Sequence, residues 1–189
     1  MTDAERIEAA VNAALPVPGW MTEQELRHLA SRAVTCSTML EIGSWQGRAT
    51  KAFAVALPPG SVIYCVDDWR GEQATPVDPH ELRGAFYTHL MRELMLGKVI
   101  HLTTTSMSFA RMMSSGWINS ITSFDYIFID GSHDKASVIA DVRAYLPFVA
   151  PGGILAGHDW QLPDVRAGVL AMLPGAVCVA GSIWEWRVE

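Results

Sequence analysis

The chain has 189 residues, of which 50% are hydrophobic and 18% are charged, and its formal net charge at pH 7 is −6. This length and composition are typical of one folded domain with a sizeable core, and they exclude an intrinsically disordered chain. The acidic balance argues against a large nucleic-acid-binding surface.

The cysteines and the N-terminal stretch favour a cytoplasmic protein. Cys36, Cys65 and Cys178 are far apart and form no CxxC pair, so we expect free core thiols in a cytoplasmic protein. The N-terminal stretch MTDAERIEAA is acidic and does not have the pattern of a secretory signal. Residues 167–184 are weakly polar, but Pro174-Gly175 interrupts them, so we expect a helix and a strand there and no membrane span.

Two capping boxes predict short amphipathic helices near the N-terminus. The pairs that form them are Thr2 with Glu5 and Thr22 with Glu25. We expect one domain, in which N-terminal helices within residues 1–37 lie against the sheet edge of a core formed by residues 38–189. Trp20 and Met21, between the helices, are expected to pack in the core, with a contact to a ligand as the alternative.

Residues 39–50, MLEIGSWQGRAT, read as a short strand, a glycine turn and the start of a helix at Arg48. Such a turn presents backbone N–H groups and the positive end of a helix dipole at the carboxyl edge of a sheet, where open α/β sheets bind ligands. Trp45 occupies a position at which a dinucleotide fingerprint needs glycine, which favours a nucleoside ligand without a pyrophosphate. An ordinary turn that needs glycine for positive φ is the alternative.

The second predicted strand, residues 62–66, is continuously apolar and leads into Asp67. A carboxylate at this strand tip is placed to accept both hydroxyls of a ribose, although a solvated turn aspartate has the same sequence pattern. The polar loop of residues 70–79 precedes a helix that Gly97 ends, and we expect this loop to contact the substrate. A third strand over residues 99–105 and a methionine-rich helix over residues 109–117 follow.

Polar side chains follow the next two predicted strands, residues 126–129 and residues 154–156. These strands are expected to be parallel neighbours, with Pro147 and Pro151-Gly152-Gly153 ending the helix between them and the second strand starting at Ile154. Their carboxyl ends therefore lie at the same edge as Gly43 and Asp67. The titratable residues delivered there are Asp130, His133, His158 and Asp159. Four such groups at strand tips are hard to explain as packing.

These motifs resemble a known family. The pattern Glu41-x-Gly43-x-x-x-Gly47 resembles motif I of class I S-adenosylmethionine-dependent methyltransferases. The run IDGSH, a helix, APGG and GHDW is similar to the small bacterial family of cephalosporin-hydroxylase-like proteins and relatives of macrocin O-methyltransferases, over about residues 19–160. The resemblance implies a Rossmann-like α/β fold with a mostly parallel seven-stranded sheet, an antiparallel last strand and helices on both faces. Trp184 and Trp186 would then share one face of that last strand.

The resemblance also implies roles for individual residues. S-adenosyl-L-methionine is expected to bind at Glu41, Gly43, Ser44, Gly47, Asp67, Thr105, Ser106 and Asp130. In metal-dependent relatives a carboxylate after the fourth strand and an acidic pair after the fifth hold Mg²⁺, and Asp130 and Asp159 match those positions. His158 departs from the acidic pair, and as a ligand it would suit Mn²⁺, Fe²⁺ or Zn²⁺ better than Mg²⁺.

We therefore expect O-methylation of a hydroxylated small molecule, with Asp130 and His133 as the catalytic residues. Either a metal held by Asp130, His158 and Asp159 lowers the pKa of the acceptor hydroxyl, or His133 takes its proton. The alternatives are a nicotinamide-dependent oxidoreductase and a non-catalytic protein that binds the cofactor or a partner. No nucleic acid or membrane partner is expected, and a second subunit of a homo-oligomer could complete the acceptor pocket.

Overall fold

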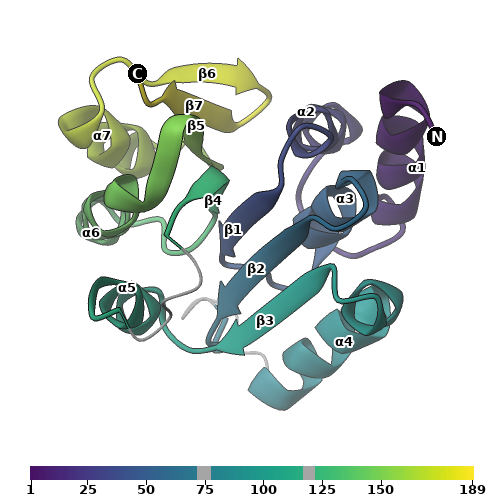
Figure 1. The fold of residues 1–189 in the computed structure, drawn as a ribbon. Coiled ribbons are helices and arrows are strands. Elements are labelled where there is room, and N and C mark those ends of the chain that lie inside the picture. The colour runs from purple at the N-terminus through teal and green to yellow at the C-terminus, as the bar shows by residue number, and fades with distance from the viewer. Residues whose placement is uncertain (72–77, 117–121) are drawn as a thin grey trace.

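The computed structural model describes residues 1–71, 78–116 and 122–189. Within these residues seven strands form one sheet in the order β3-β2-β1-β4-β5-β7-β6 (Figure 1). The strands are β1 (Thr38–Ile42), β2 (Val62–Asp67), β3 (Val99–Thr103), β4 (Phe124–Ile129), β5 (Val149–Gly157), β6 (Val177–Ala180) and β7 (Ile183–Arg187). The strands from β1 to β5 pair in parallel, and β7 runs antiparallel to both of its neighbours. The predicted Rossmann-like sheet is confirmed.

Helices cover both faces of the sheet (Figure 1). One face packs against α1 (Asp3–Ala14), α2 (Glu23–Ala33), α3 (Arg48–Ala56) and α4 (Pro79–Met95). The other packs against α5 (Ser106–Ser114), α6 (Lys135–Tyr145), with the 3-10 turn Leu146–Phe148 after it, and α7 (Pro163–Met172). Neighbouring strand residues alternate between the two cores, as the pleat requires. No helix in the described parts of the chain is both long enough and apolar enough to cross a membrane.

Both predicted capping boxes are present at the starts of α1 and α2. Met21 is buried, as expected, but the expectation that Trp20 packs in the core is wrong: its side chain is 76% exposed. The turn before it is held by Arg48, whose guanidinium donates to the carbonyl oxygens of Val17 and Gly19. This leaves the Trp20 ring on the surface, with its centroid 5.3 Å from that of Trp45.

Three further expectations need correction or restriction. Strand β5 begins at Val149 and not at Ile154, so Pro151-Gly152-Gly153 lies inside the strand, where a register shift opposite β4 accommodates the extra residues. Cys178 is exposed because β6 is an edge strand, whereas Cys36 and Cys65 are buried thiols. Trp117 and most of the predicted substrate loop, residues 72–77, lie outside the described residues.

Candidate active site

The glycine turn after β1 depends on two glycines. Gly43 and Gly47 have φ values of +85° and +89°, which L-residues with a side chain rarely adopt. A Cβ on Gly43 would lie 2.0 Å from the carbonyl oxygen of Asp130, and a Cβ on Gly47 would lie 2.4 Å from a methyl carbon of Leu90. The turn therefore packs directly against the end of β4 on one side and against α4 on the other.

Glu41 supports this turn from below. Its side chain is fully buried, and one carboxylate oxygen accepts hydrogen bonds from the hydroxyls of Ser44, at 2.6 Å, and Thr50. Burial raises the pKa of Glu41 to about 7, although these two hydroxyls lower it. The other carboxylate oxygen is buried without a hydrogen-bond partner in the described protein. Glu41 and Ser44 thus shape the turn, and their contact with a cofactor stays a prediction.

Asp67 clamps the same turn from the tip of β2. One of its oxygens accepts the backbone N–H groups of Ser44 at 2.8 Å and Trp45 at 2.9 Å, and the other accepts that of Trp69 at 2.6 Å. Trp45 and Trp69 both have positive φ, +50° and +54°, which is costly for residues with a side chain. Burial raises the pKa of Asp67, and the three N–H donors offset this in part. Ribose binding by Asp67 stays a prediction.

The helix that follows the turn has an uncapped N-terminus. Helix α3 starts at Arg48, directly after Gly47, and no side chain caps it with a hydrogen bond. The first N–H groups of a helix have no partner within the helix and carry a partial positive charge, so they attract a carboxylate or another anion.

The two residues predicted to meet an adenine have contacts of their own. Thr105 is the N-cap of α5, and its hydroxyl accepts the backbone N–H of Ser108 at 3.2 Å. The hydroxyl of Ser106 donates to the buried carboxylate of Asp141, while the Tyr145 hydroxyl donates to the Ser106 carbonyl at 2.7 Å. Their adenine contact stays a prediction, because these bonds account for helix α5 without a ligand.

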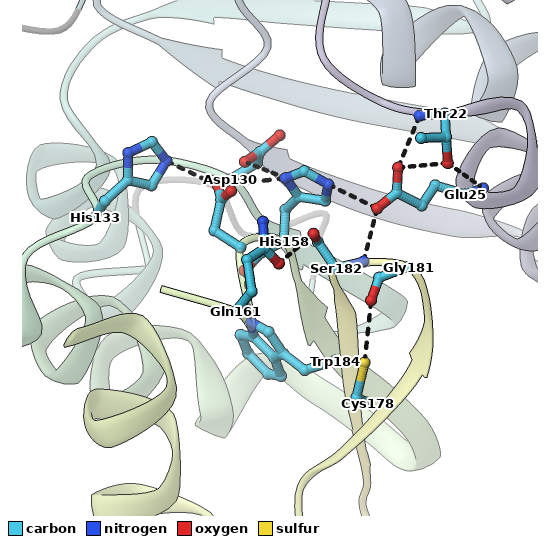
Figure 2. A network of polar contacts seen from close by, with 11 residues as sticks. Thr22, Glu25, Asp130, His133, His158, Gln161, Cys178, Gly181, Ser182 and Trp184 are labelled. Carbon is cyan, nitrogen blue, oxygen red and sulfur yellow. Dashed lines mark hydrogen bonds and ion pairs between the residues drawn. The ribbon is translucent and has the colours of Figure 1, made fainter. Parts of the chain in front are cut away.

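The titratable residues that follow β4 and β5 come together as the sequence predicts (Figure 2). The Nε2 atom of His133 lies 2.9 Å from a carboxylate oxygen of Asp159. The Nδ1 atom of His158 lies 3.3 Å from the same oxygen and 3.8 Å from a carboxylate oxygen of Asp130. One ligand atom each from Asp130, His133 and Asp159 lies within 4.8 Å of the others. We call Asp130, His133, His158 and Asp159 the strand-tip cluster.

Burial and mutual charge shift the pKa values in the cluster. Burial raises the pKa of Asp130 to about 6, although the neighbouring His158 lowers it. Burial disfavours the charged form of His158, but hydrogen bonds to Asp159 and Glu25 outweigh it and raise its pKa to about 10. The pKa of Asp159 is lowered, because hydrogen bonds from His133 and His158 outweigh its burial. The cluster therefore holds a cationic His158 beside an ionised Asp159 at neutral pH.

This electrostatic arrangement bears on metal binding. A protonated imidazole donates from both nitrogens and has no lone pair for a cation. Among the described residues, the ligand atoms that lie close enough together for a divalent cation belong to Asp130, Asp159 and His133, a set of two carboxylates and one imidazole that suits Mn²⁺ or Zn²⁺ better than Mg²⁺. The role of His158 as a ligand stays a prediction.

Two features of the cluster were not expected from the sequence. Asp159 has a φ of +60°, a left-handed conformation that aspartate tolerates better than most residues. The second feature is Glu25, whose carboxylate reaches His158 from α2 at 3.1 Å. The capping box had marked Glu25 only as a helix cap, and nothing in the sequence pairs it with a residue 133 positions away.

A cavity of about 220 Å³ lies at the opposite edge of the sheet, near the starts of β4 and β5. Its charged side chains already have protein partners. Arg32 donates to Glu185, Arg187 donates to the carbonyl of Gly152, and Asp125 accepts two backbone N–H groups. Among the described residues, the strand-tip cluster is therefore a better candidate for the active site than this cavity.

Comparison with known proteins identifies a family. The family model described as a methyltransferase domain matches residues 40–160, which include the glycine turn and the strand-tip cluster. No curated protein matches the chain significantly in sequence.

Solved structures of O-methyltransferases have the same fold. An enzyme from Bacillus cereus in complex with SAH is 17% identical, with a TM-score of 0.68 over 98% of this chain and 91% of that one. TomG from Streptomyces achromogenes, involved in tomaymycin synthesis and in complex with SAM, is 16% identical, with a TM-score of 0.68 over 98% and 90%. A putative O-methyltransferase from Klebsiella pneumoniae is 16% identical, with a TM-score of 0.67 over 100% and 91%. At these identities the likeness establishes the fold.

Proposed function

Since the chain belongs to the family of methyltransferase domains, we propose that it transfers the methyl group of S-adenosyl-L-methionine to a hydroxyl of a small molecule. The observation that carries this proposal is the packing of Gly43 against Asp130. Because of this packing, the glycine turn, which suits a nucleoside, lies directly beside the strand-tip cluster. The cofactor and the groups that activate an acceptor would therefore share one site.

The residues of the turn fit this cofactor. The uncapped start of α3 after Gly47 suits the carboxylate of its methionine part. Asp67, at the tip of β2, supplies carboxylate oxygens beside the turn, where a ribose would need acceptors. The Rossmann-like relatives in complex with SAH or SAM, from Bacillus cereus and Streptomyces achromogenes, support the same cofactor here.

When bound, S-adenosyl-L-methionine supplies an electrophilic methyl group on a positively charged sulfur. The protein then has to hold the acceptor oxygen in line with that carbon and to remove the proton of the hydroxyl. We assign proton removal to His133, because the carboxylate of Asp159 contacts its Nε2 atom at 2.9 Å and would orient the ring and stabilise its charged form. Asp130 adds negative charge beside the acceptor.

A divalent cation held by Asp130, His133 and Asp159 is the second way to activate the hydroxyl, since a cation lowers the pKa of an oxygen bound to it. The two arrangements exclude one another at His133, which cannot ligate a cation and accept the proton with the same lone pair. The acceptor is proposed to be a hydroxylated small molecule such as a sugar or a natural-product intermediate.

Calorimetric binding tests the proposal directly. We expect micromolar affinity for S-adenosylmethionine and S-adenosylhomocysteine, with no binding of NAD as the matched control. Turnover of any acceptor in a screen of hydroxylated small molecules would then exclude a non-catalytic relative. Failure of both sulfur nucleosides to bind would overturn the proposed function.

A further inference from the structure

Glu25 has two sets of contacts, one on each carboxylate oxygen. One oxygen accepts the backbone N–H and the hydroxyl of Thr22, both at 2.7 Å, which completes the capping box of α2. The other accepts the backbone N–H of Ser182 at 2.7 Å and the Nε2 atom of His158 at 3.1 Å. Capping needs only the first oxygen and does not require a buried side chain, yet only 4% of the Glu25 side chain is exposed. The second set of contacts therefore needs an explanation of its own.

The second oxygen fixes the ring of His158 from behind. Figure 2 shows the imidazole between Glu25 on one side and the carboxylate of Asp130 on the other. The carbonyl of His158 accepts the indole N–H of Trp184 at 3.1 Å, which holds the backbone of the same residue. With Nε2 bound to Glu25, the Nδ1 atom is left facing the cluster, 3.3 Å from Asp159.

The turn between β6 and β7 is built around this carboxylate. Gly181 has a φ of +53°, and a Cβ there would lie 2.4 Å from the Glu25 oxygen that binds His158. The neighbouring Ser182 donates its N–H to that oxygen. Backbone from the last hairpin thus closes over Glu25, which excludes water and strengthens the hydrogen bond to His158.

We propose that Glu25 is a positioning residue for the reaction, which fixes the His158 ring and through it the carboxylate of Asp159 in the strand-tip cluster. The two histidine contacts of Asp159 come from His158 on one side and His133 on the other. Glu25 lies outside residues 40–160, which the family model matches, so this role makes helix α2 part of the site. The consequence for turnover rests on the proposed function, and the ring geometry does not.

The first experiment needs neither cofactor nor acceptor. A ring N–H that is hydrogen-bonded to a buried carboxylate exchanges slowly with water, and histidine labelled with ¹⁵N would show it as a downfield signal. The His158→Gln variant assigns the signal. We expect the signal to disappear in Glu25→Ala and to persist in Thr22→Ala, which loses the helix cap but keeps the second oxygen. Glu25→Gln keeps the size of the side chain and one oxygen, and we expect it to restore the signal in part.

Persistence of the signal in Glu25→Ala, or its absence from the unaltered protein, would overturn the proposal. Loss of the signal in Thr22→Ala to the same extent would also overturn it, because the effect would then come from helix α2 as a whole.

The second experiment measures turnover of an acceptor from the screen. We expect Glu25→Ala to lower kcat at least tenfold, with affinity for S-adenosylmethionine within threefold of the unaltered protein, and Thr22→Ala to keep kcat. An unchanged kcat in a variant that has lost the ring signal would overturn the positioning role. Failure of the unaltered protein to bind S-adenosylmethionine would instead overturn the proposed function, while the ring signal would still decide whether Glu25 fixes His158.

Discussion

The backbone N–H of Trp45 donates a 2.9 Å hydrogen bond to the carboxylate of Asp67, which joins the turn after β1 to the tip of β2. The same carboxylate accepts two more N–H groups, from Ser44 and Trp69, and so holds two tryptophans in left-handed backbone conformations. The predicted cofactor turn is therefore held in shape by the protein before any ligand binds. A site formed in advance binds more tightly, because no loop has to be ordered on binding.

Replacing Asp67 by asparagine tests this clamp. The amide keeps the size of the side chain but offers one oxygen in place of two, so at least one buried N–H loses its acceptor. We expect the free energy of unfolding to fall by about 1–3 kcal/mol in urea titrations, and the affinity for S-adenosylhomocysteine to fall about tenfold. Asp68→Asn is the control, since the Asp68 side chain is one-third exposed and should lose little stability. Equal losses in both variants would contradict the clamp.

Gly43 should tolerate a side chain far less well than Gly60. The two residues have nearly the same φ, +85° and +84°, so alanine pays the same conformational cost of about 1–2 kcal/mol at each. They differ in space: a Cβ meets the Asp130 carbonyl oxygen at 2.0 Å in one case and nothing within 4 Å in the other. We expect Gly43→Ala to lose at least about 2 kcal/mol more than Gly60→Ala in chemical unfolding, since the neighbouring backbone must shift. Similar losses would show that the turn after β1 does not pack closely against the end of β4.

A divalent cation should stabilise the protein through the strand-tip cluster if the metal arrangement is correct. We expect Mn²⁺ to raise Tm and to bind in calorimetry with a greater affinity than Mg²⁺, because one of the three donors is an imidazole. Asp159→Asn should abolish the response, since asparagine keeps the left-handed backbone and loses the charge.

Asp134→Asn is the control for this experiment. It removes an exposed charge next to His133 in sequence, while the asparagine oxygen can still cap α6, so Tm should change little and the Mn²⁺ response should remain. Activity in the presence of a chelator, together with no response to Mn²⁺, would favour His133 as the base.

The elements of the fold could be predicted from the sequence because their signals are local, whereas the seven-stranded sheet with its antiparallel last strand was implied by the family resemblance. The capping box that Thr22 forms with Glu25, the glycine turns and the apolar runs each depend on neighbouring residues, and parallel strands necessarily gather their carboxyl ends at one edge. The same reasoning brought Asp130 and Asp159 together.

Long-range contacts and exposed surfaces were not predictable in this way. The surface position of Trp20 and the exposure of Cys178 depend on which segments lie beside them, and hydrophobicity alone favours the core for both. The contact of Glu25 with His158 depends on how α2 docks beside the last hairpin, and no pattern within either segment encodes it.

The stability of the protein should depend on the ionisation of Glu41. Burial raises its pKa to about 7 in the folded protein, from 4.5, so between these values the folded state holds a proton that the unfolded chain releases. This contribution to stability is fully present below pH 4.5 and is lost as pH rises through about 7, because ionisation then occurs in a buried site.

The glutamine variant keeps an oxygen for the hydroxyls of Ser44 and Thr50 and cannot ionise. Relative to the unaltered protein, Glu41→Gln should therefore gain roughly 3 kcal/mol on going from pH 4.5 to pH 8. Urea unfolding at both pH values measures this difference, with the exposed Glu81→Gln as control. A difference between variant and unaltered protein that does not change with pH would show that Glu41 is already ionised at low pH in the folded state.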